Sequence, residues 1–346
     1  MSAVLLALLL ATRSDPASAG AEPPALPTTS GEELRARVIS APRTAAERAD
    51  YLTALWMQAG AAPDAIELQP VLPLVEGRIA AFRAKLVRAT SGPAFPPPVR
   101  QALLNLESKA LQEIPANRIV RIPGSSERTL VLGAHCDVDG RSPGRLDNAS
   151  GCVLLADLYA RLRAQTPRHT LVFVGFTGQR LGHLGAQAFV SSLDPDARSR
   201  VTAAIVLESL GSGDLSMWWE VSSVSIAEVA AEVARRRGQA FTAWSFEAPG
   251  GDARPFRQEK MSVLHLQGLA PASVARIGTE GDDGSDLDPA RLEQALEFLL
   301  ALVRELDDLE GPPRLSDVKA RFQLDESAGW KPLAPVPLAT LLGPPP

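Results

Sequence analysis

The sequence is poor in the residues on which disulfide-rich, thiolate-metal and nucleic-acid-binding proteins depend. Its 346 residues include two cysteines, Cys136 and Cys152, too few for a disulfide framework or a four-thiolate zinc site. Their spacing leaves open whether they pair with each other or remain two buried thiols. The 35 basic residues are outnumbered by 40 acidic ones, and the resulting net charge of −5 argues against binding nucleic acid through phosphate neutralisation.

Long apolar runs are also missing. No stretch approaches the roughly 18–20 residues of a membrane span, so no membrane span is predicted. Histidine is scarce, with four residues in all, which limits the imidazoles available to a metal site. What the sequence does have is a globular composition, 45% hydrophobic and 22% charged, in a chain long enough for one large core.

The N-terminus carries a short apolar core, Val4–Ala11, followed by the small-residue pattern Ala17-Ser18-Ala19. Residues 1–19 therefore resemble a secretory signal peptide, which predicts a periplasmic or extracellular protein with residues 20–31 as a linker. Because no basic residue precedes Val4, a buried N-terminal helix is the alternative.

Beyond this region, helical periodicity alternates with short apolar strands. The pattern predicts an α/β fold, a three-layer sandwich with a mainly parallel central sheet covered by helices on both faces. The expected strands are 118–122, 129–135, 170–176, 203–207, 241–246 and 263–266. The expected helices are 32–40, 45–60, 152–163, 181–192, 225–238 and 289–309. We expect one domain, residues 32–310, with a helical insertion at about 72–115 and a proline-rich C-terminal tail, 311–346, draped on it.

Three of the predicted strand–helix junctions carry residues suited to metal binding. His135 ends one strand, Asp147 precedes the helix that starts near residue 150, and Glu208 ends another strand. Sites in open α/β sheets form at the carboxyl ends of the strands, and one imidazole with two carboxylates suits a zinc ion. Asp137 is placed to accept a hydrogen bond from the other ring nitrogen of His135.

Each of these residues alone has a simpler interpretation. A His-x-Asp pattern is more often a capped turn than a metal site. Asp147 and Asn148 stand where they can cap the following helix, and Glu208 can be a satisfied carboxylate at a strand end. The order and spacing of the whole set favour the metal site.

Four segments together resemble the co-catalytic zinc aminopeptidases of metallopeptidase family M28. They are AHCD, LDNASGCVLLADLYARL, TLVFVGFTGQRLGHLGAQAFV and AAIVLESLG. The resemblance extends over residues 32–308 apart from the helical insertion, and it implies the zinc-exopeptidase fold. Active members of the family hold two zinc ions that share a bridging Asp, and a Glu beside one ligand is the general base.

The resemblance assigns His135, Asp147 and Glu208 to one zinc ion, with Glu208 in place of an Asp. The residues implied for the second ion and for the general base are absent. Gln179-Arg180-Leu181-Gly182 stands where the family has Glu-Glu-x-Gly, Arg276-Ile277-Gly278-Thr279 where it has Arg-Ile-His-Thr, and Gly251-Asp252-Ala253 where it has Ser-Asp-His. His183 and His265 are possible replacement ligands, but surface or satisfied core histidines are the better interpretation.

These replacements affect one metal site and leave the other intact. Gln179 has no basic oxygen to deprotonate water, Arg180 is a permanent cation, and Gly278 has no side chain to bind metal. We therefore expect at most one zinc ion, and a salt bridge from Arg180 to Asp147 in place of the second ion.

Three functions are compatible with this pattern. The favoured one is a catalytically impaired or inactive aminopeptidase-like domain that binds a peptide or protein. The alternative is an active mononuclear-zinc hydrolase that uses His135, Asp147 and Glu208, with Arg180 as an electrophile for an oxyanion. A glutaminyl-cyclase-like enzyme is disfavoured, because the resemblance places at its zinc site the Glu and His that this chain lacks. The sequence leaves the oligomeric state open.

Overall fold

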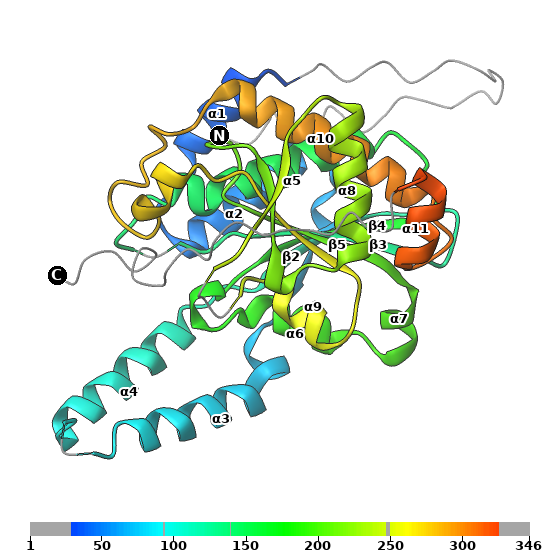
Figure 1. Ribbon diagram of the computed structural model, residues 1–346. Coiled ribbons are helices and arrows are strands. Elements are labelled where there is room, and N and C mark those ends of the chain that lie inside the picture. The colour runs from blue at the N-terminus through cyan, green and yellow to red at the C-terminus, as the bar shows by residue number, and fades with distance from the viewer. Residues whose placement is uncertain (1–28, 93, 139, 247–249, 325–346) are drawn as a thin grey trace, which may run out of the picture.

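The computed structural model describes residues 29–92, 94–138, 140–246 and 250–324. The predicted signal peptide, most of the linker and residues 325–346 of the tail lie outside these ranges. The centre of the molecule is an eight-stranded sheet with the order β1-β2-β4-β3-β5-β8-β6-β7 (Figure 1). The strands are β1 (Glu67–Gln69), β2 (Asn117–Ile122), β3 (Thr129–His135), β4 (Thr170–Phe176), β5 (Val201–Glu208), β6 (Leu215–Trp218), β7 (Phe241–Trp244) and β8 (Val263–Gln267).

The four central strands, β4, β3, β5 and β8, are all parallel to one another. They are buried on both faces, which explains why their sequences are apolar throughout rather than alternating. Strands β1, β2 and β6 each pair antiparallel with a neighbour, so the sheet is mixed but mainly parallel, as predicted. Two of these strands, β1 and β6, were not expected, because three or four residues carry too little alternation to be detected.

Two layers of helices cover the sheet (Figure 1). One layer is α1 (Gly31–Ser40), α2 (Ala45–Gln58), α5 (Ser150–Leu162), α8 (Val224–Arg236), α10 (Pro289–Asp307) and α11 (Leu315–Phe322). The other is α6 (Leu184–Ser192), α7 (Pro195–Arg200) and α9 (Ala253–Gln258). The three-layer α/β sandwich is thereby confirmed.

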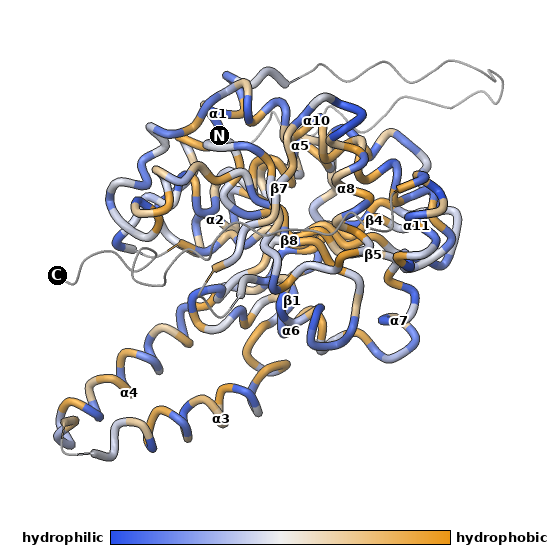
Figure 2. Tube along the Cα trace, in the orientation of Figure 1, coloured by the Kyte–Doolittle hydropathy of each residue, from blue (hydrophilic) through white to orange (hydrophobic). Residues whose placement is uncertain are grey.

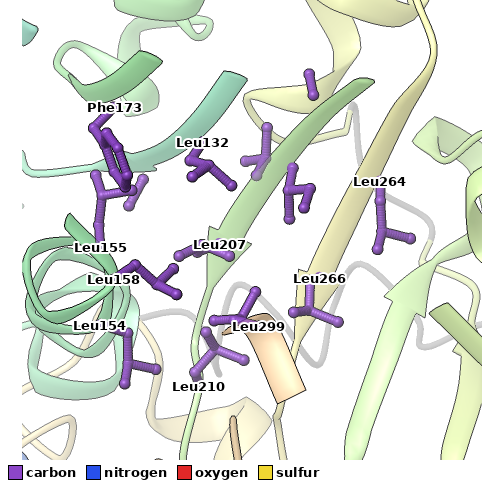
Figure 3. Close-up of a cluster of buried hydrophobic side chains, with 14 of the residues drawn as sticks. Leu132, Leu154, Leu155, Leu158, Phe173, Leu207, Leu210, Leu264, Leu266 and Leu299 are labelled. Carbon is purple, nitrogen blue, oxygen red and sulfur yellow. The ribbon is translucent and has the colours of Figure 1, made fainter. Parts of the chain in front are cut away.

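The hydrophobic core extends over both faces of the sheet, since it includes Leu154 of α5 in one helix layer and Phe189 of α6 in the other. Leu154, Leu155 and Leu158 of α5 pack toward Leu132 of β3 and Leu207 of β5, and all five are buried (Figure 3). Full burial of one such side chain contributes about 1.5–3 kcal/mol, so this interface holds β3 and β5 firmly in place. The strand ends that carry the candidate site thus rest on a rigid support. The hydrophobic colour of the strands in Figure 2 marks the same core.

Two segments differ from expectation. The helix expected at 181–192 begins at Leu184, because Gly182 and His183 adopt left-handed φ values of +90° and +63° and interrupt the helical path. The described part of the predicted tail contains the helix α11, which packs on α8 and buries Val318. The helical insertion forms a protruding pair, α3 (Leu72–Ala89) and α4 (Pro97–Gln112).

Candidate metal centre

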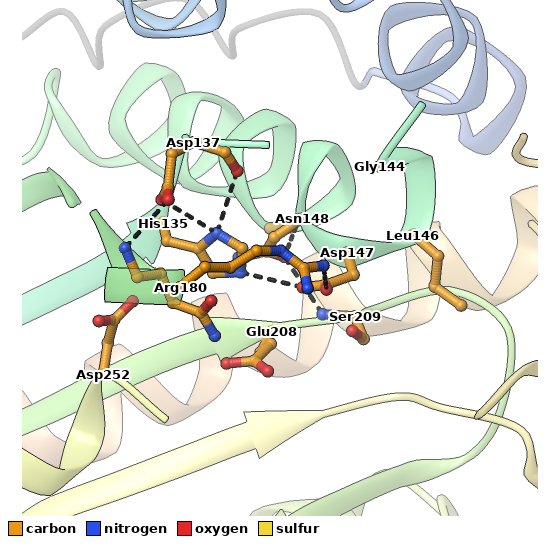
Figure 4. Close-up of polar contacts among 12 residues, drawn as sticks. His135, Asp137, Gly144, Leu146, Asp147, Asn148, Arg180, Glu208, Ser209 and Asp252 are labelled. Atoms are coloured by element: carbon orange, nitrogen blue, oxygen red, sulfur yellow. Dashed lines mark hydrogen bonds and ion pairs between the residues drawn. The ribbon is translucent and has the colours of Figure 1, made fainter. Parts of the chain in front are cut away.

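His135 and Asp147 meet at the carboxyl end of β3. His135 is the last residue of this strand, and Asp147 lies in the irregular turn Arg145–Ala149 that leads into α5. Nε2 of His135 is 3.0 Å from Oδ1 of Asp147, and both side chains are buried (Figure 4). The structure therefore joins two residues from different elements into one polar cluster.

The helix-capping interpretation applies to Asn148 and not to Asp147. Oδ1 of Asn148 accepts hydrogen bonds from the backbone N–H groups of Gly151 and Ser209, both at 3.1 Å. Its amide nitrogen donates to the carbonyl of Leu207 at 2.8 Å. Asn148 thus ties the start of α5 to the end of β5, which leaves the carboxylate of Asp147 available for the site.

Asp282 holds the turn Arg145–Ala149 in place, a role that the sequence did not predict. Its carboxylate accepts the backbone N–H of Leu146 at 2.6 Å and of Asp147 at 3.1 Å. Burial raises the pKa of Asp282 to about 6, and the negative charge of Asp147 adds to this shift. The one sequence signal was an acidic run at 280–288, which does not distinguish Asp282 from its neighbours.

Asp137 lies beside the other ring nitrogen of His135, with a different geometry from the one expected. Nδ1 of His135 is 3.3 Å from the backbone oxygen of Asp137 and 3.5 Å from its carboxylate Oδ1. The second carboxylate oxygen, Oδ2, accepts the backbone N–H of Gln179 at 3.0 Å. Asp137 therefore orients the imidazole mainly through its main chain and anchors the turn that carries Gln179 and Arg180.

These carboxylates change the titration of His135. Burial by itself lowers the pKa of an imidazole, but the hydrogen bonds and charges of Asp137 and Asp147 outweigh burial and raise the pKa of His135. The contact between His135 and Asp147 has the opposite effect on the pKa of Asp147. Burial opposes its ionisation, yet His135 and Arg180 hold its pKa below the ordinary value.

Glu208, at the end of β5, is held by a histidine from the neighbouring strand. Oε2 of Glu208 is 3.2 Å from Nε2 of His265, which is fully buried. Burial raises the pKa of Glu208, but the contact with His265 outweighs this effect and lowers it. His265 is therefore a buried core histidine that contacts the Glu208 carboxylate, and it is not one of the clustered donors.

Gly251 makes room for this histidine. A Cβ atom at residue 251 would lie 2.2 Å from Cε1 of His265 and 3.0 Å from Oε2 of Glu208. No side chain fits at such distances without movement of the imidazole. The resemblance places a serine at this position, so Gly251 and His265 form a matched pair in this chain.

The donor atoms of His135, Asp147 and Glu208 all lie within 4.8 Å of one another. Zinc binds ligands at about 2 Å, and tetrahedral geometry then spaces the ligand atoms roughly 3.3 Å apart. Small side-chain movements are enough to bring these three donors around one ion. No other group of three such residues was found in the described part of the chain.

Arg180 and Gly278 occupy the space beside this donor set. Arg180 lies in the turn Gln179–Leu181 that follows β4, and its Nη2 is 3.3 Å from Oδ2 of Asp147. The predicted salt bridge is present and joins the buried Asp147 to an Arg180 side chain that is 39% exposed. A Cβ atom at Gly278 would lie 3.3 Å from both Nη atoms of Arg180.

The remaining predicted residues lie nearby without joining the donor set. Nδ1 of His183 is 3.6 Å from Oδ1 of the fully buried Asp252, too far for a hydrogen bond. Cys136 and Cys152 are both buried and free, and the thiol of Cys152 donates to the carbonyl of His135 at 3.1 Å. The two cysteines therefore form no disulfide and pack as buried thiols next to His135.

Comparison with known proteins identifies the family. Residues 117–303 match the sequence profile of Peptidase family M28, and this match covers more than half of the chain, which therefore belongs to that family. The protein described as "Probable leucine aminopeptidase" from Trichophyton verrucosum is 37% identical over 95 residues. That match covers 24% of this chain and 26% of the relative, so the chain spans about a quarter of the length of this curated protein.

Solved structures agree on the fold. The LapA aminopeptidase of Legionella pneumophila superimposes with a TM-score of 0.61 at 14% identity, over 82% of this chain and 72% of that one. A glutaminyl cyclase from an Acidobacteriales bacterium gives 0.59 at 17% identity, over 85% of this chain and 99% of that one. Membership of family M28 implies zinc as the metal, and the donor cluster of this chain is suited to that ion.

Proposed function

We propose that this protein is an M28-type aminopeptidase-like domain that holds at most one zinc ion, is impaired in hydrolysis, and binds a peptide or protein ligand. The observation that carries the proposal is the position of the Arg180 guanidinium, paired with Asp147 and in contact distance of Gly278. A fixed positive charge there takes over the neutralisation of Asp147 that the resemblance assigns to a second zinc ion.

The absence of a general base also supports impaired hydrolysis. Gln179 stands where the resemblance requires a Glu that deprotonates water, and a neutral amide does not accept that proton. Loss of a general base alone reduces a hydrolytic rate by roughly two to four orders of magnitude. The backbone of Gln179 nevertheless remains anchored to Asp137, so the turn keeps its place while its chemistry is gone.

The residues that remain support ligand binding. His135, Asp147 and Glu208 would hold one zinc ion, which supplies Lewis-acid polarisation of a ligand oxygen when bound. Arg180 is 39% exposed and donates one hydrogen bond to Asp147, so its guanidinium keeps further N–H donors for a carboxylate or carbonyl of a peptide.

Zinc analysis combined with an aminopeptidase assay tests the proposal. We expect at most one zinc ion per chain after dialysis, and release of p-nitroaniline from aminoacyl-p-nitroanilides at least a hundredfold slower than by an active family member assayed in parallel. Zinc-dependent activity comparable to that of the active member would overturn the proposal.

A mononuclear hydrolase is the second candidate, and the intact donor cluster favours it. In this mechanism Arg180 acts as an electrophile for an oxyanion. Activity that requires one zinc ion, and that is lost in both His135→Ala and Arg180→Ala, would establish it. The likeness to a glutaminyl cyclase shows the fold alone, and Arg180 and Gly278 stand where the resemblance needs that enzyme's zinc ligands.

For localisation, none of the described helices is both long and apolar enough to cross a membrane. We infer export to a periplasmic or extracellular space from the signal-peptide pattern of residues 1–19. N-terminal sequencing of the protein secreted by its host tests this inference, with a new terminus near residue 20 as the expected result.

A further inference from the structure

The helical hairpin α3–α4 protrudes from the domain and packs on it only at its base (Figure 1). There, Val71, Val75 and Leu111 form a small cluster with Leu184 and Ala188, which belong to α6. Farther out, the two helices are joined by the ion pair of Arg83 with Glu107, at 2.9 Å. Along most of their length, α3 and α4 therefore face solvent.

Much of the exposed apolar surface of the described chain is concentrated on this hairpin. Of ten exposed large hydrophobic side chains, six belong to it: Leu74, Phe82, Val87, Phe95, Val99 and Leu106. Leu106 is 65% exposed and Phe82 57%, and a concentration of exposed apolar side chains on one element marks a candidate interaction surface. Figure 2 shows hydrophobic and hydrophilic segments interleaved along both helices.

Phe82 and Leu106 lie on the same side of the hairpin. Each precedes by one residue the Arg83–Glu107 pair that joins the two helices. Arg83 and Glu107 point toward each other across the hairpin, and the residue one position earlier in an α-helix is rotated by about 100°. Because the two helices run in opposite directions, this rotation brings Phe82 and Leu106 to the same side of the hairpin. Val99, one heptad before Leu106, extends the apolar stripe on α4.

The charge of the hairpin is opposite to that of the rest of the chain. Residues 72–112 contain six basic and two acidic residues, a net charge of +4. Because the whole chain carries −5, the remainder carries −9. Arg78 and Lys85 lie four residues before and three after Phe82, which places both next to it on the helix surface. Lys85 and Arg88 have no ion-pair partner among the described residues.

We propose that the α3–α4 hairpin docks on the surface of an anionic phospholipid bilayer. Phe82, Val99 and Leu106 enter the boundary between headgroups and acyl chains, while Lys85 and Arg88 contact lipid phosphates. Aromatic and aliphatic side chains flanked by basic residues are the features that bind helices in the plane of a membrane. Charge selects this partner, because the acidic remainder of the chain is repelled by the same surface and leaves the hairpin as the point of contact.

Sedimentation of the full chain with vesicles tests the proposal. We expect binding to vesicles of 30% phosphatidylglycerol in phosphatidylcholine, weak binding to pure phosphatidylcholine, and loss of binding in high salt. Lys85→Gln with Arg88→Gln should weaken partitioning on the order of 20-fold, since each basic residue near such a surface contributes about fivefold. Phe82→Ser with Leu106→Ser should reduce it further.

Matched controls separate docking from general effects. Met57→Ser with Leu315→Ser removes two exposed hydrophobic side chains outside the hairpin and should leave vesicle binding unchanged. Circular dichroism of each variant checks that the fold is retained. Equal binding to neutral and anionic vesicles, or no binding at all, would overturn the proposal. A dimer in light scattering that Phe82→Ser with Leu106→Ser dissociates would assign the hairpin to self-association instead.

Discussion

The two terminal nitrogens of Arg180 lie 3.3 Å from the point where a Cβ atom would stand at Gly278, although 97 residues separate the two positions in sequence. A side chain at residue 278 would crowd this guanidinium, which would have to move by a few tenths of an ångström to admit it. The histidine that the resemblance expects at residue 278 therefore competes for space with Arg180 in its present position.

Zinc content gives the most direct prediction. We expect at most one zinc ion per chain after dialysis, and a lower content in His135→Ala or Glu208→Gln, because each removes or weakens one of three donors. Inductively coupled plasma mass spectrometry measures the content. Two tightly held equivalents would show that the donors are misassigned.

Replacement of Arg180 by alanine should affect stability and zinc affinity in opposite directions. In zinc-free protein, the loss of its contact with Asp147 should cost about 0.5–1 kcal/mol, because a side chain that is 39% exposed is screened by solvent. Zinc binding should become several-fold tighter, since a cation next to a ligand carboxylate repels the ion. Urea unfolding and competition with a chelator measure the two effects.

Arg180→Lys is the control for this pair of measurements. Lysine keeps the charge but not the planar guanidinium, so its zinc affinity should stay near that of the parent protein. Tighter zinc binding in the lysine variant as well would show that the charge of Arg180 is not what opposes the metal.

His265→Gln should loosen zinc by 10- to 100-fold without removing any ligand. The imidazole lies 3.2 Å from Glu208 and fixes that carboxylate, and loss of such a supporting contact typically has this effect on metal affinity. The matched control is His169→Gln, because His169 is equally buried and contacts Asp307 at 3.0 Å, away from the site. Equal zinc affinities in the two variants would contradict this role of His265.

The triple variant Gln179→Glu, Arg180→Glu and Gly278→His should bind a second zinc ion and gain aminopeptidase activity. Gly278 has a φ of +75°, so histidine there carries backbone strain of about 1–2 kcal/mol, which the second metal has to offset. The double variant without the change at Gly278 is the control and should remain inactive. Activity in the double variant would mean that the second ion does not need this ligand.

The sequence by itself determined the fold class, the membership of the family and the residues of the donor cluster. Apolar strands alternating with amphipathic helices admit few arrangements other than a covered parallel sheet. In such a sheet the carboxyl ends of neighbouring strands share one edge, so residues at the ends of β3 and β5 had to come close. His135 and Glu208 were found for this reason.

Tertiary structure alone decided which groups surround these residues. His265 appeared to be an ordinary core histidine because it lies in the middle of β8, and the parallel register opposite Val206 is what brings it diagonally next to Glu208. The support from Asp282 and the close approach of Arg180 to Gly278 likewise depend on contacts between segments far apart in sequence. Local sequence patterns predict whether a segment is a helix or a strand, whereas the contacts between side chains of different elements depend on how those elements pack.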